Sequence, residues 1–551
     1  MRLKSRLTAA ALLAMTLLPL HATTVLVHAH IHTMDPDRPE ATGLAWDDSG
    51  KLVGVGSDTE LKQQFPDARQ IDAKGATVIP GLIDAHGHML GLGMLSGQVD
   101  LAGSTSKEDV IARLKAGAAK LPKGAWLIGH GWDQNRWPGK QFPTAADLDR
   151  AFPDRPVFLE RIDGHATWVN TVALKRATQS LDGDWQPEGG RIMRVGKKAS
   201  GVLIDGAQAL VRNAIPPLTP EQTREAYKHA FAEAVSVGLT GVHDPGVSLD
   251  DFKVLQQMAG ASEIPLRLYE MADGNHAALE WLCQQGGAWK DSSGHLRMRT
   301  VKLYMDGALG SRGAALLEDY NDDHGNRGIF VTQPDEYKAA VEKAMRCKVQ
   351  VATHAIGDRG NRMVLDTYQS VLGHYADSDH RWRVEHAQIV ALSDIPRFAQ
   401  LHLIASMQPT HATSDMPWVE QRLGYKRLEG AYAWQRFIHI GVPLAFGSDF
   451  PVEQVNPMLG IYAAVTRQNL AGQPPGGWFP DQRVSRIQAL AGFTRGAAYA
   501  AFMEGEVGTL KPGYRADFVL LDADIMAVEP RRIADIKPLS TWVDGKAVYQ
   551  R

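Results

Sequence analysis

Short apolar runs alternate with helix-like segments through the middle of the chain, and this pattern indicates the fold. Buried parallel strands appear in a sequence as short continuous apolar runs, because both faces of such a sheet are covered. The runs lie at 82–86, 239–243, 266–270, 300–304, 350–354, 383–386, 403–407 and 443–447, with helical patterns at 221–237, 334–346 and 361–372. Eight strands with intervening helices predict an α/β fold of the (β/α)8 TIM-type barrel class.

Both ends of the chain are rich in strand-forming residues. At the C-terminus, 540–548 has the pattern of a hairpin around Asp544-Gly545, a pair typical of tight β-turns. We therefore expect one small β-sandwich domain built from both termini. Two further apolar runs, 126–129 and 157–159, predict a subdomain inserted after the first barrel strand. The expected units are a signal peptide at 1–22, sandwich parts at 23–80 and 501–551, and a barrel at 81–500 with its insertion at about 100–220.

The first 22 residues have the pattern of a secretory signal. Arg2, Lys4 and Arg6 form a positive region, and an apolar segment at 7–20 follows that is too short for a membrane span. Ala22 is a small residue suited to cleavage. The alternative is an uncleaved anchor, which the short apolar segment makes less favourable. We expect an exported protein, periplasmic or secreted, without a membrane segment once the signal is removed.

The overall composition is that of an ordinary globular protein. The 551 residues carry a formal net charge of −3, so no broad basic surface for nucleic acid is present. We therefore expect no nucleic-acid partner, and a homodimer is the default expectation for a soluble protein. The chain has two cysteines, Cys283 and Cys347. Export would permit a disulfide, but nothing in the sequence requires these residues to meet, and two separate buried thiols are the favoured interpretation.

Several residues typical of metal sites stand at the ends of the predicted strands. His86 and His88 follow the first run, and if the strand continues through them their side chains face the same side. The active site of a barrel lies at the C-terminal ends of its strands. Reading those ends in order gives His86, His88, Lys302, His354, His386 and Asp449. Each residue alone has a structural alternative, such as a hydrogen-bonded histidine or a helix cap, but the ordered set favours a metal site.

This order of residues resembles the amidohydrolase superfamily, and the surrounding sequence is similar to its third branch, the YtcJ-like enzymes. The matching stretches are 131–133 with Trp137-Pro138, 163–166, 306–312, 354–358, 385–388, 447–451 and 508–517. The stretch 306–312, Asp-Gly-Ala-Leu-Gly-Ser-Arg, is the most specific to this branch. The resemblance covers nearly all of the mature chain.

The resemblance implies two divalent metal ions, most often Zn²⁺. His86, His88 and Asp449 would hold one ion, and His354 and His386 the other. Carboxylated Lys302 would bridge both, since a lysine ammonium has no acceptor and cannot ligate a cation, whereas a carbamate offers anionic oxygens that can reach two metals. The alternatives are an unmodified Lys302 beside a single metal, or a Lys302 paired with an acid such as Asp306.

The implied activity is hydrolysis of a carbon–nitrogen bond in a small-molecule substrate, a non-peptide amide that is either an N-acyl or an N-substituted amide. A hydroxide bridging the metals would attack the carbonyl, and Asp449 would carry its proton to the leaving nitrogen. One alternative is a lactone or ester hydrolase on the same site. Another is a non-catalytic binding protein on the same fold, although a complete ligand set argues against it.

Four further residues are candidates for binding substrate: Trp132, His165, Arg312 and His411. Arg312 could bind a substrate carboxylate, or form a structural ion pair instead. His165 lies in the predicted insertion and could close over the barrel mouth as part of a lid. Trp132 and Trp137 could form an apolar wall, although a place in a core is the commoner outcome for tryptophan. His243 also ends a strand, and we expect it near the site but without a metal.

Overall fold

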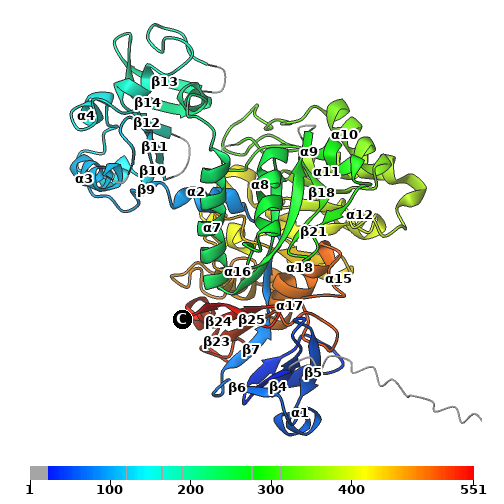
Figure 1. Cartoon of the computed structure of the whole chain (residues 1–551). Coiled ribbons are helices and arrows are strands. Elements are labelled where there is room, and N and C mark those ends of the chain that lie inside the picture. The colour runs from blue at the N-terminus through cyan, green and yellow to red at the C-terminus, as the bar shows by residue number, and fades with distance from the viewer. Residues whose placement is uncertain (1–22, 120, 163–165, 188–189, 275–276, 311) are drawn as a thin grey trace, which may run out of the picture.

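The computed structural model describes residues 23–119, 121–162, 166–187, 190–274, 277–310 and 312–551. The predicted signal peptide at 1–22 lies outside these residues and stays a prediction. Figure 1 shows a central barrel with β-rich units at two opposite ends of the molecule. No helix in the described ranges is both long and apolar enough to cross a membrane.

Among the described residues, one sheet contains eight parallel strands in the order β8, β15, β16, β18, β19, β20, β21, β22. Their bounds are β8 (Leu82–Asp84), β15 (Leu239–Val247), β16 (Arg267–Asp273), β18 (Leu296–Tyr304), β19 (Gln350–Ala355), β20 (Arg383–His386), β21 (Ile404–Met407) and β22 (Leu444–Phe446), with the short β17 (Trp289–Lys290) beside β18. The Ala85 amide donates to the Phe446 carbonyl at 3.0 Å and so connects the first strand to the last. The barrel is nearly closed, and each predicted apolar run overlaps one of its strands, which confirms the TIM-type barrel.

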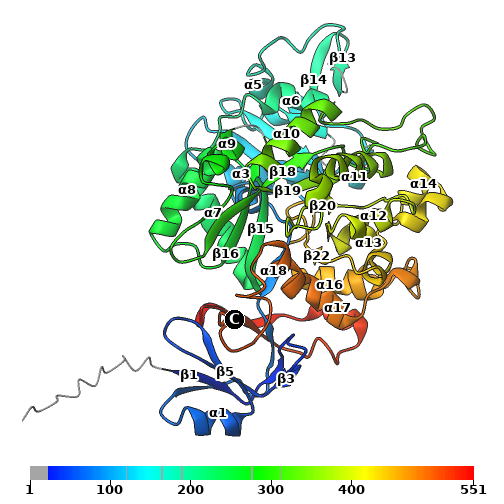
Figure 2. The same ribbon diagram turned by 90° about the vertical axis from the view of Figure 1, so that its right-hand side faces the viewer.

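Helices cover the outside of the barrel, as Figure 2 shows from the side. The helix α7 (Pro220–Ser236) begins with a capping box, in which Thr219 and Gln222 bond each other's backbone amides, and with proline in its first turn. Its buried face, including Tyr227 and Phe231, packs into the main hydrophobic core. The other helices around the barrel include α2 (Met89–Leu95), α8 (Leu249–Gly260), α9 (Ala277–Gln284), α10 (Pro334–Arg346), α11 (Asp358–Leu372), α12 (Ile395–Gln400), α13 (Pro409–Asp415), α14 (Val419–Leu423), α15 (Trp434–His439), α16 (Pro457–Thr466), α17 (Arg486–Ala491) and α18 (Ala497–Ala500).

Strands from both ends of the chain form two sheets below the barrel (Figure 1). One sheet contains β5 (Leu52–Gly56), β4 (Gly43–Trp46), β1 (Thr24–Val27) and β6 (Arg69–Asp72), near α1 (Asp58–Gln64). The other contains β25 (Lys546–Gln550), β24 (Pro538–Val543), β23 (Phe518–Leu521), β7 (Thr77–Pro80), β2 (His30–His32) and β3 (Glu40–Ala41). Antiparallel pairing of β23 with β7 joins the C-terminal strands to the N-terminal ones. Leu44 and Trp46 of the first sheet and Ile31 and Phe518 of the second belong to one hydrophobic cluster.

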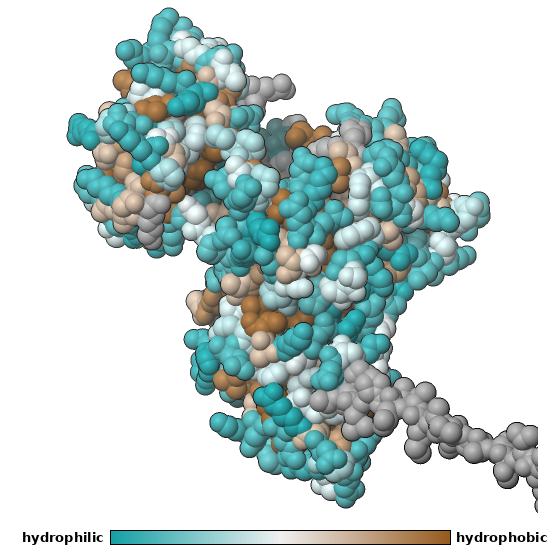
Figure 3. Space-filling view, viewed as in Figure 1, coloured by the Kyte–Doolittle hydropathy of each residue, from teal (hydrophilic) through white to brown (hydrophobic). Residues whose placement is uncertain are grey.

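A separate sheet follows the C-terminal end of β8. Figure 3 shows the unit that contains it as a lobe standing away from the barrel, with hydrophilic and apolar residues mixed on the visible face. Its strands are β13 (Gly190–Val195), β14 (Lys198–Asp205), β12 (Ala166–Val169), β11 (Val157–Arg161), β10 (Leu127–Trp132) and β9 (Val99–Asp100), with helices α3 (Lys107–Ala118), α4 (Ala145–Asp149), α5 (Thr171–Leu174) and α6 (Ala209–Arg212). Because it leaves the barrel after the C-terminal end of β8, this unit lies on the side of the barrel mouth.

The two cysteines form a disulfide, so the expectation of two separate thiols is wrong. Cys283 lies in α9 and Cys347 caps the end of α10, and their Cα atoms are 5.0 Å apart. An ion pair between Glu280 and Lys343 also joins these two helices. The cysteines are 64 positions apart, and the sequence does not show that their helices are neighbours, so the pairing could not be predicted.

Removing this disulfide should destabilise the barrel. For a loop of 64 residues, the chain-entropy model predicts a stabilisation of about 4 kcal/mol. We expect the double variant Cys283→Ser/Cys347→Ser to unfold at a lower denaturant concentration than the oxidised protein. Reduced wild-type protein is the control and should behave like the variant. Equal unfolding midpoints with and without reductant would contradict the pairing.

Candidate metal centre

The six predicted metal ligands lie together where five barrel strands end. Lys302 and His354 lie near the C-terminal ends of strands β18 and β19, and His386 is the last residue of β20. The segment after β8 carries His86 and His88, and the segment after β22 carries Asp449. Parallel strands that end at one rim bring together side chains from distant parts of the sequence.

His86 and His88 meet around Asp449, although β8 ends before them at Asp84. Their Nε2 atoms lie 3.7 Å and 3.2 Å from Asp449 Oδ1. The carboxylate of Asp84 accepts bonds from the His86 amide and from the amide and hydroxyl of Ser448. This bonding, rather than a continued strand, holds the two segments side by side. Ligand atoms of His86, His88 and Asp449 all lie within 4.8 Å of one another, close enough to hold one metal ion.

His354 and His386 lie beside His86. The ring centroids of His354 and His386 are 4.5 Å apart, and those of His86 and His386 are 4.8 Å apart. Nδ1 of His386 bonds Oε1 of Gln408 at 2.8 Å, which leaves its Nε2 for another partner. Among the described residues, the buried His354 Nε2 has no hydrogen-bond partner. A buried ring nitrogen without a hydrogen-bond partner, next to a second histidine, is suited to ligate a metal ion.

Lys302 points into the same group, with its Nζ 3.2 Å from His86 Nε2. Burial lowers the pKa of Lys302 to about 8, although the negative charges of Glu385 and Asp449 oppose the shift. The alternative partner Asp306 is occupied elsewhere, because its carboxylate accepts the backbone amides of Ala315, Ile356 and Gly357. Lys302 therefore faces the histidines rather than an ion-pair partner of its own.

Three histidines of the group, His86, His354 and His386, are neutral at physiological pH because their pKa values are lowered. Burial lowers the pKa of His86 to about 4 and that of His354 to about 3, and the positive charge of Lys302 adds to both shifts. Burial also holds the pKa of His386 well below its ordinary value. A metal binds the neutral imidazole, so these residues are already in the protonation state that ligation requires.

Asp449 is held as a carboxylate in a constrained position. Its backbone φ of 64° is in the left-handed region, and His386 has a φ of 72°. Strained backbone of this kind persists where surrounding contacts fix it, and it is common at functional sites. Burial opposes the charge of Asp449, but hydrogen bonds from His411 and His88 outweigh it and hold its pKa well below the usual range.

A buried ion-pair network orients His86, and it was not predicted from the sequence. Glu385 Oε2 accepts from Nδ1 of His86, so the Nε2 of that ring faces Asp449 and Lys302. Arg383 bonds both oxygens of Glu385 and also contacts Nδ1 of His243 at 3.0 Å. Carboxylates that orient ligand histidines in this way are common in metal sites. The alternation of Arg383 and Glu385 in β20 was the available signal, because it places both charges on one face of the strand.

The chain matches the amidohydrolase family over residues 69–549. It is also 34% identical over 531 residues to YtcJ of Bacillus subtilis (strain 168), a protein named as an amidohydrolase, with 95% of this chain and 98% of that protein covered. The chain belongs to the amidohydrolase family. This confirms the predicted family and makes the chain a hydrolase of carbon–nitrogen bonds.

Two further relatives are similar along nearly the whole length of this amidohydrolase. N-substituted formamide deformylase of Arthrobacter pascens is 25% identical over 543 residues, with 96% of this chain and 98% of that protein covered. The crystal structure of a metal-dependent hydrolase from Pyrococcus horikoshii has 28% identity and a TM-score of 0.79, with 92% of this chain and 99% of that chain covered.

The residues predicted to bind substrate in this amidohydrolase lie in different places. His411 is at the centre, with its Nε2 3.2 Å from Asp449 Oδ2 and its Nδ1 3.2 Å from Glu453 Oε1. Burial disfavours its charged form, but these two carboxylates outweigh burial and raise the pKa of His411 to about 10. Arg312 pairs through two nitrogens with Asp322, which is the structural ion pair considered as its alternative. His165 lies outside the described residues.

The prediction that Trp132 lines the pocket is not supported. Trp132 is fully buried in the cluster of the inserted sheet, and its indole N–H donates to the Leu159 carbonyl. Trp137 and Trp168 pack against it. A large aromatic side chain stabilises this small sheet by filling its core, and the sequence motif could not distinguish that role from a pocket wall.

Proposed function

We propose that this amidohydrolase uses two divalent metal ions to cleave the carbon–nitrogen bond of an N-acyl or N-substituted amide. The observation that carries the proposal is the position of His86 and His88 around the ionised Asp449, with the buried, neutral His354 and His386 beside His86. A set of imidazoles with a carboxylate suits Zn²⁺ among the common divalent ions. His86, His88 and Asp449 would hold one ion, and His354 and His386 the other.

Lys302 would join the two ions as a carbamate. Carbon dioxide reacts with the neutral amine, and a pKa of about 8 leaves roughly a tenth of such side chains uncharged at pH 7. An unperturbed lysine, with a pKa near 10.4, would be neutral in fewer than about one molecule in a thousand. The lowered pKa and the 3.2 Å approach to His86 therefore support carboxylation of this residue.

The residues of the chain provide the proton transfers. When bound, the metal ions would polarise the scissile carbonyl and lower the pKa of a water molecule. Asp449 accepts a proton as the water attacks and donates this proton to the leaving nitrogen. The nitrogen must be protonated because an amide anion is a poor leaving group. His411 donates to Asp449 Oδ2 and keeps the carboxylate ionised and oriented between turnovers.

The similarity to N-substituted formamide deformylase of Arthrobacter pascens supports an N-substituted amide as the substrate class. The test is a panel of N-alkyl formamides and N-acyl amines together with the ester of each acyl group. We expect amide hydrolysis that falls by at least about a hundredfold after dialysis against a chelator and returns with Zn²⁺. Hydrolysis of esters alone would favour the lactone or ester alternative. Amide hydrolysis that survives complete metal removal would contradict the proposal.

A further inference from the structure

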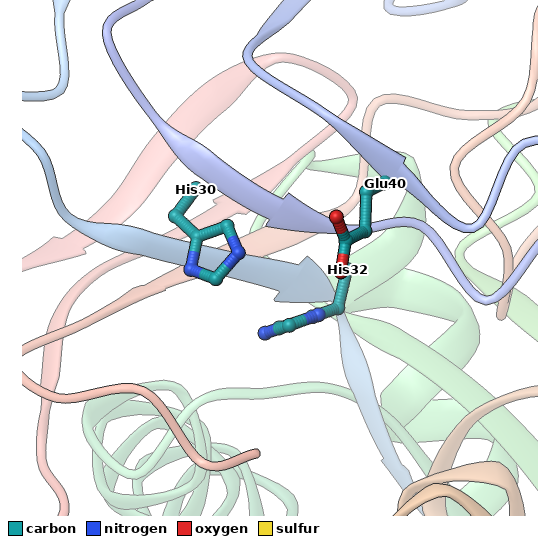
Figure 4. Close-up of side chains that lie close together, drawn as sticks. All are labelled: His30, His32 and Glu40. Carbon is teal, nitrogen blue, oxygen red and sulfur yellow. The ribbon is translucent and has the colours of Figure 1, made fainter. Parts of the chain in front are cut away.

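A second group of metal-binding side chains lies in the sheet formed by the two chain ends, apart from the barrel mouth. Ligand atoms of His30, His32 and Glu40 lie within 4.8 Å of one another. Figure 4 shows the two imidazoles and the carboxylate pointing toward one another from neighbouring strands. These residues belong to β2 and β3, which pair antiparallel at the edge of the six-stranded sheet.

The strand geometry explains why these side chains meet. Residues two apart on a strand share a face, so His30 and His32 project together while Ile31 is fully buried in the cluster between the terminal sheets. Glu40 is directly opposite His32 in the register of β2 and β3. Side chains in such a cross-strand pair lie close together, so both strands contribute to one face of the sheet.

A fourth residue reaches the same place from the other end of the sequence. Asp524, which follows β23, has one carboxylate oxygen 2.9 Å from Nε2 of His32 and the other 3.3 Å from Nδ1 of His30. The amide of Met526 donates to Oδ1 of Asp524 and fixes the orientation of that carboxylate. His32 and Asp524 are 492 positions apart in the chain.

The geometry is close to that of a coordinated ion. Two ligands about 2.1 Å from a tetrahedral zinc ion lie about 3.4 Å from each other. Asp524 approaches the two histidines to 2.9 Å and 3.3 Å, at or below this spacing. The ligand atoms of Glu40 and the histidines lie within 4.8 Å of one another, and the long exposed side chain of Glu40 can move toward an ion. The side chain of His30 is 48% exposed, so an ion can enter from solvent. Two imidazoles with two carboxylates suit zinc and similar divalent ions.

We propose that His30, His32, Glu40 and Asp524 bind one zinc-class divalent ion at a site separate from the catalytic centre. A bound ion would link strands β2 and β3 of the N-terminal segment to the segment that follows β23. It would therefore stabilise the unit built from both chain ends without taking part in the reaction. The site does not depend on the proposed catalytic function.

The test is a calorimetric titration of Zn²⁺ into protein that already carries its catalytic metals. Wild-type protein should bind one further equivalent, with an affinity in the micromolar range or tighter. His30→Gln and Asp524→Asn should each weaken this binding at least about tenfold, because each removes a ligand. His28→Gln is the matched control, since His28 is similarly exposed (54%) but pairs with Asp72 instead. It should titrate like wild type.

Amide hydrolysis verifies that the variants are folded, because all three should retain wild-type activity. An anomalous map at the zinc edge should show an ion beside His30 in the wild type and none there in His30→Gln. The proposal is overturned if wild-type protein takes up no further equivalent. It is also overturned if His30→Gln and His28→Gln bind Zn²⁺ equally, which would indicate scattered surface binding.

Discussion

The variant Asp449→Asn is expected to lose at least about a thousandfold in kcat while keeping the fold. An amide cannot accept the proton of the attacking water, nor can it donate one to the leaving nitrogen at the required moment. The substitution also removes the negative charge that His88 and His411 approach at 3.2 Å. We therefore expect weaker metal retention together with the loss of turnover.

Glu453→Gln provides the matched control for this prediction. Glu453 is also an acid beside His411, but it contacts the far ring nitrogen and not the metal ligands. Its loss should lower kcat less than about tenfold, since the His411 contact with Asp449 remains. Both variants should be measured for kcat, metal content and thermal unfolding. An Asp449→Asn enzyme that keeps more than about a tenth of wild-type kcat would remove Asp449 from the mechanism.

Replacement of Lys302 by arginine should be nearly as damaging. Arginine preserves the positive charge but stays protonated, so it cannot form a carbamate or act as a ligand. We expect kcat to fall by about a thousandfold or more and metal content to drop, because the bridging ligand is missing. Lys343→Arg is the control, since Lys343 pairs with Glu280 at the surface and should tolerate the change.

If reactivation of the metal-free enzyme depends on bicarbonate, Lys302 acts as a bridging carbamate and not as an unmodified, positively charged side chain. Metal-free wild-type protein in buffer depleted of carbon dioxide should regain activity slowly with Zn²⁺ alone and faster as bicarbonate is added. Protein grown or exchanged with ¹³C-bicarbonate should show a carbamate resonance that Lys302→Arg lacks. Full reactivation without bicarbonate, together with no such resonance, would favour an unmodified lysine beside a single metal.

The barrel could be predicted from the sequence because its strands are buried on both faces. Such strands appear as continuous apolar runs, and each of the runs from 82–86 to 443–447 overlaps a strand of the structure. Since parallel strands place their C-terminal ends at one rim, the same runs also indicated that His354, His386 and Asp449 would lie close together. Their proximity follows from topology and did not require knowledge of side-chain packing.

The features that were not predicted depend on contacts between segments whose positions in space the pattern of apolar and polar residues does not show. The Cys283–Cys347 disulfide requires α9 and α10 to be neighbours, and outer helices carry no sign of their neighbours in the sequence. Trp132 lies in a conspicuous motif but packs in the core of the inserted sheet. Glu385 was not predicted to belong to the site, although the alternation of strand residues places it on the same face as Arg383.

A crystal structure with anomalous data at the zinc edge would show directly whether the barrel mouth holds two metal ions. We expect two strong peaks there, one among His86, His88 and Asp449 and one beside His354 and His386. We also expect density beyond Nζ of Lys302 that connects them. A zinc-loaded crystal with no peak within reach of these side chains would contradict the account, whatever is found beside His30.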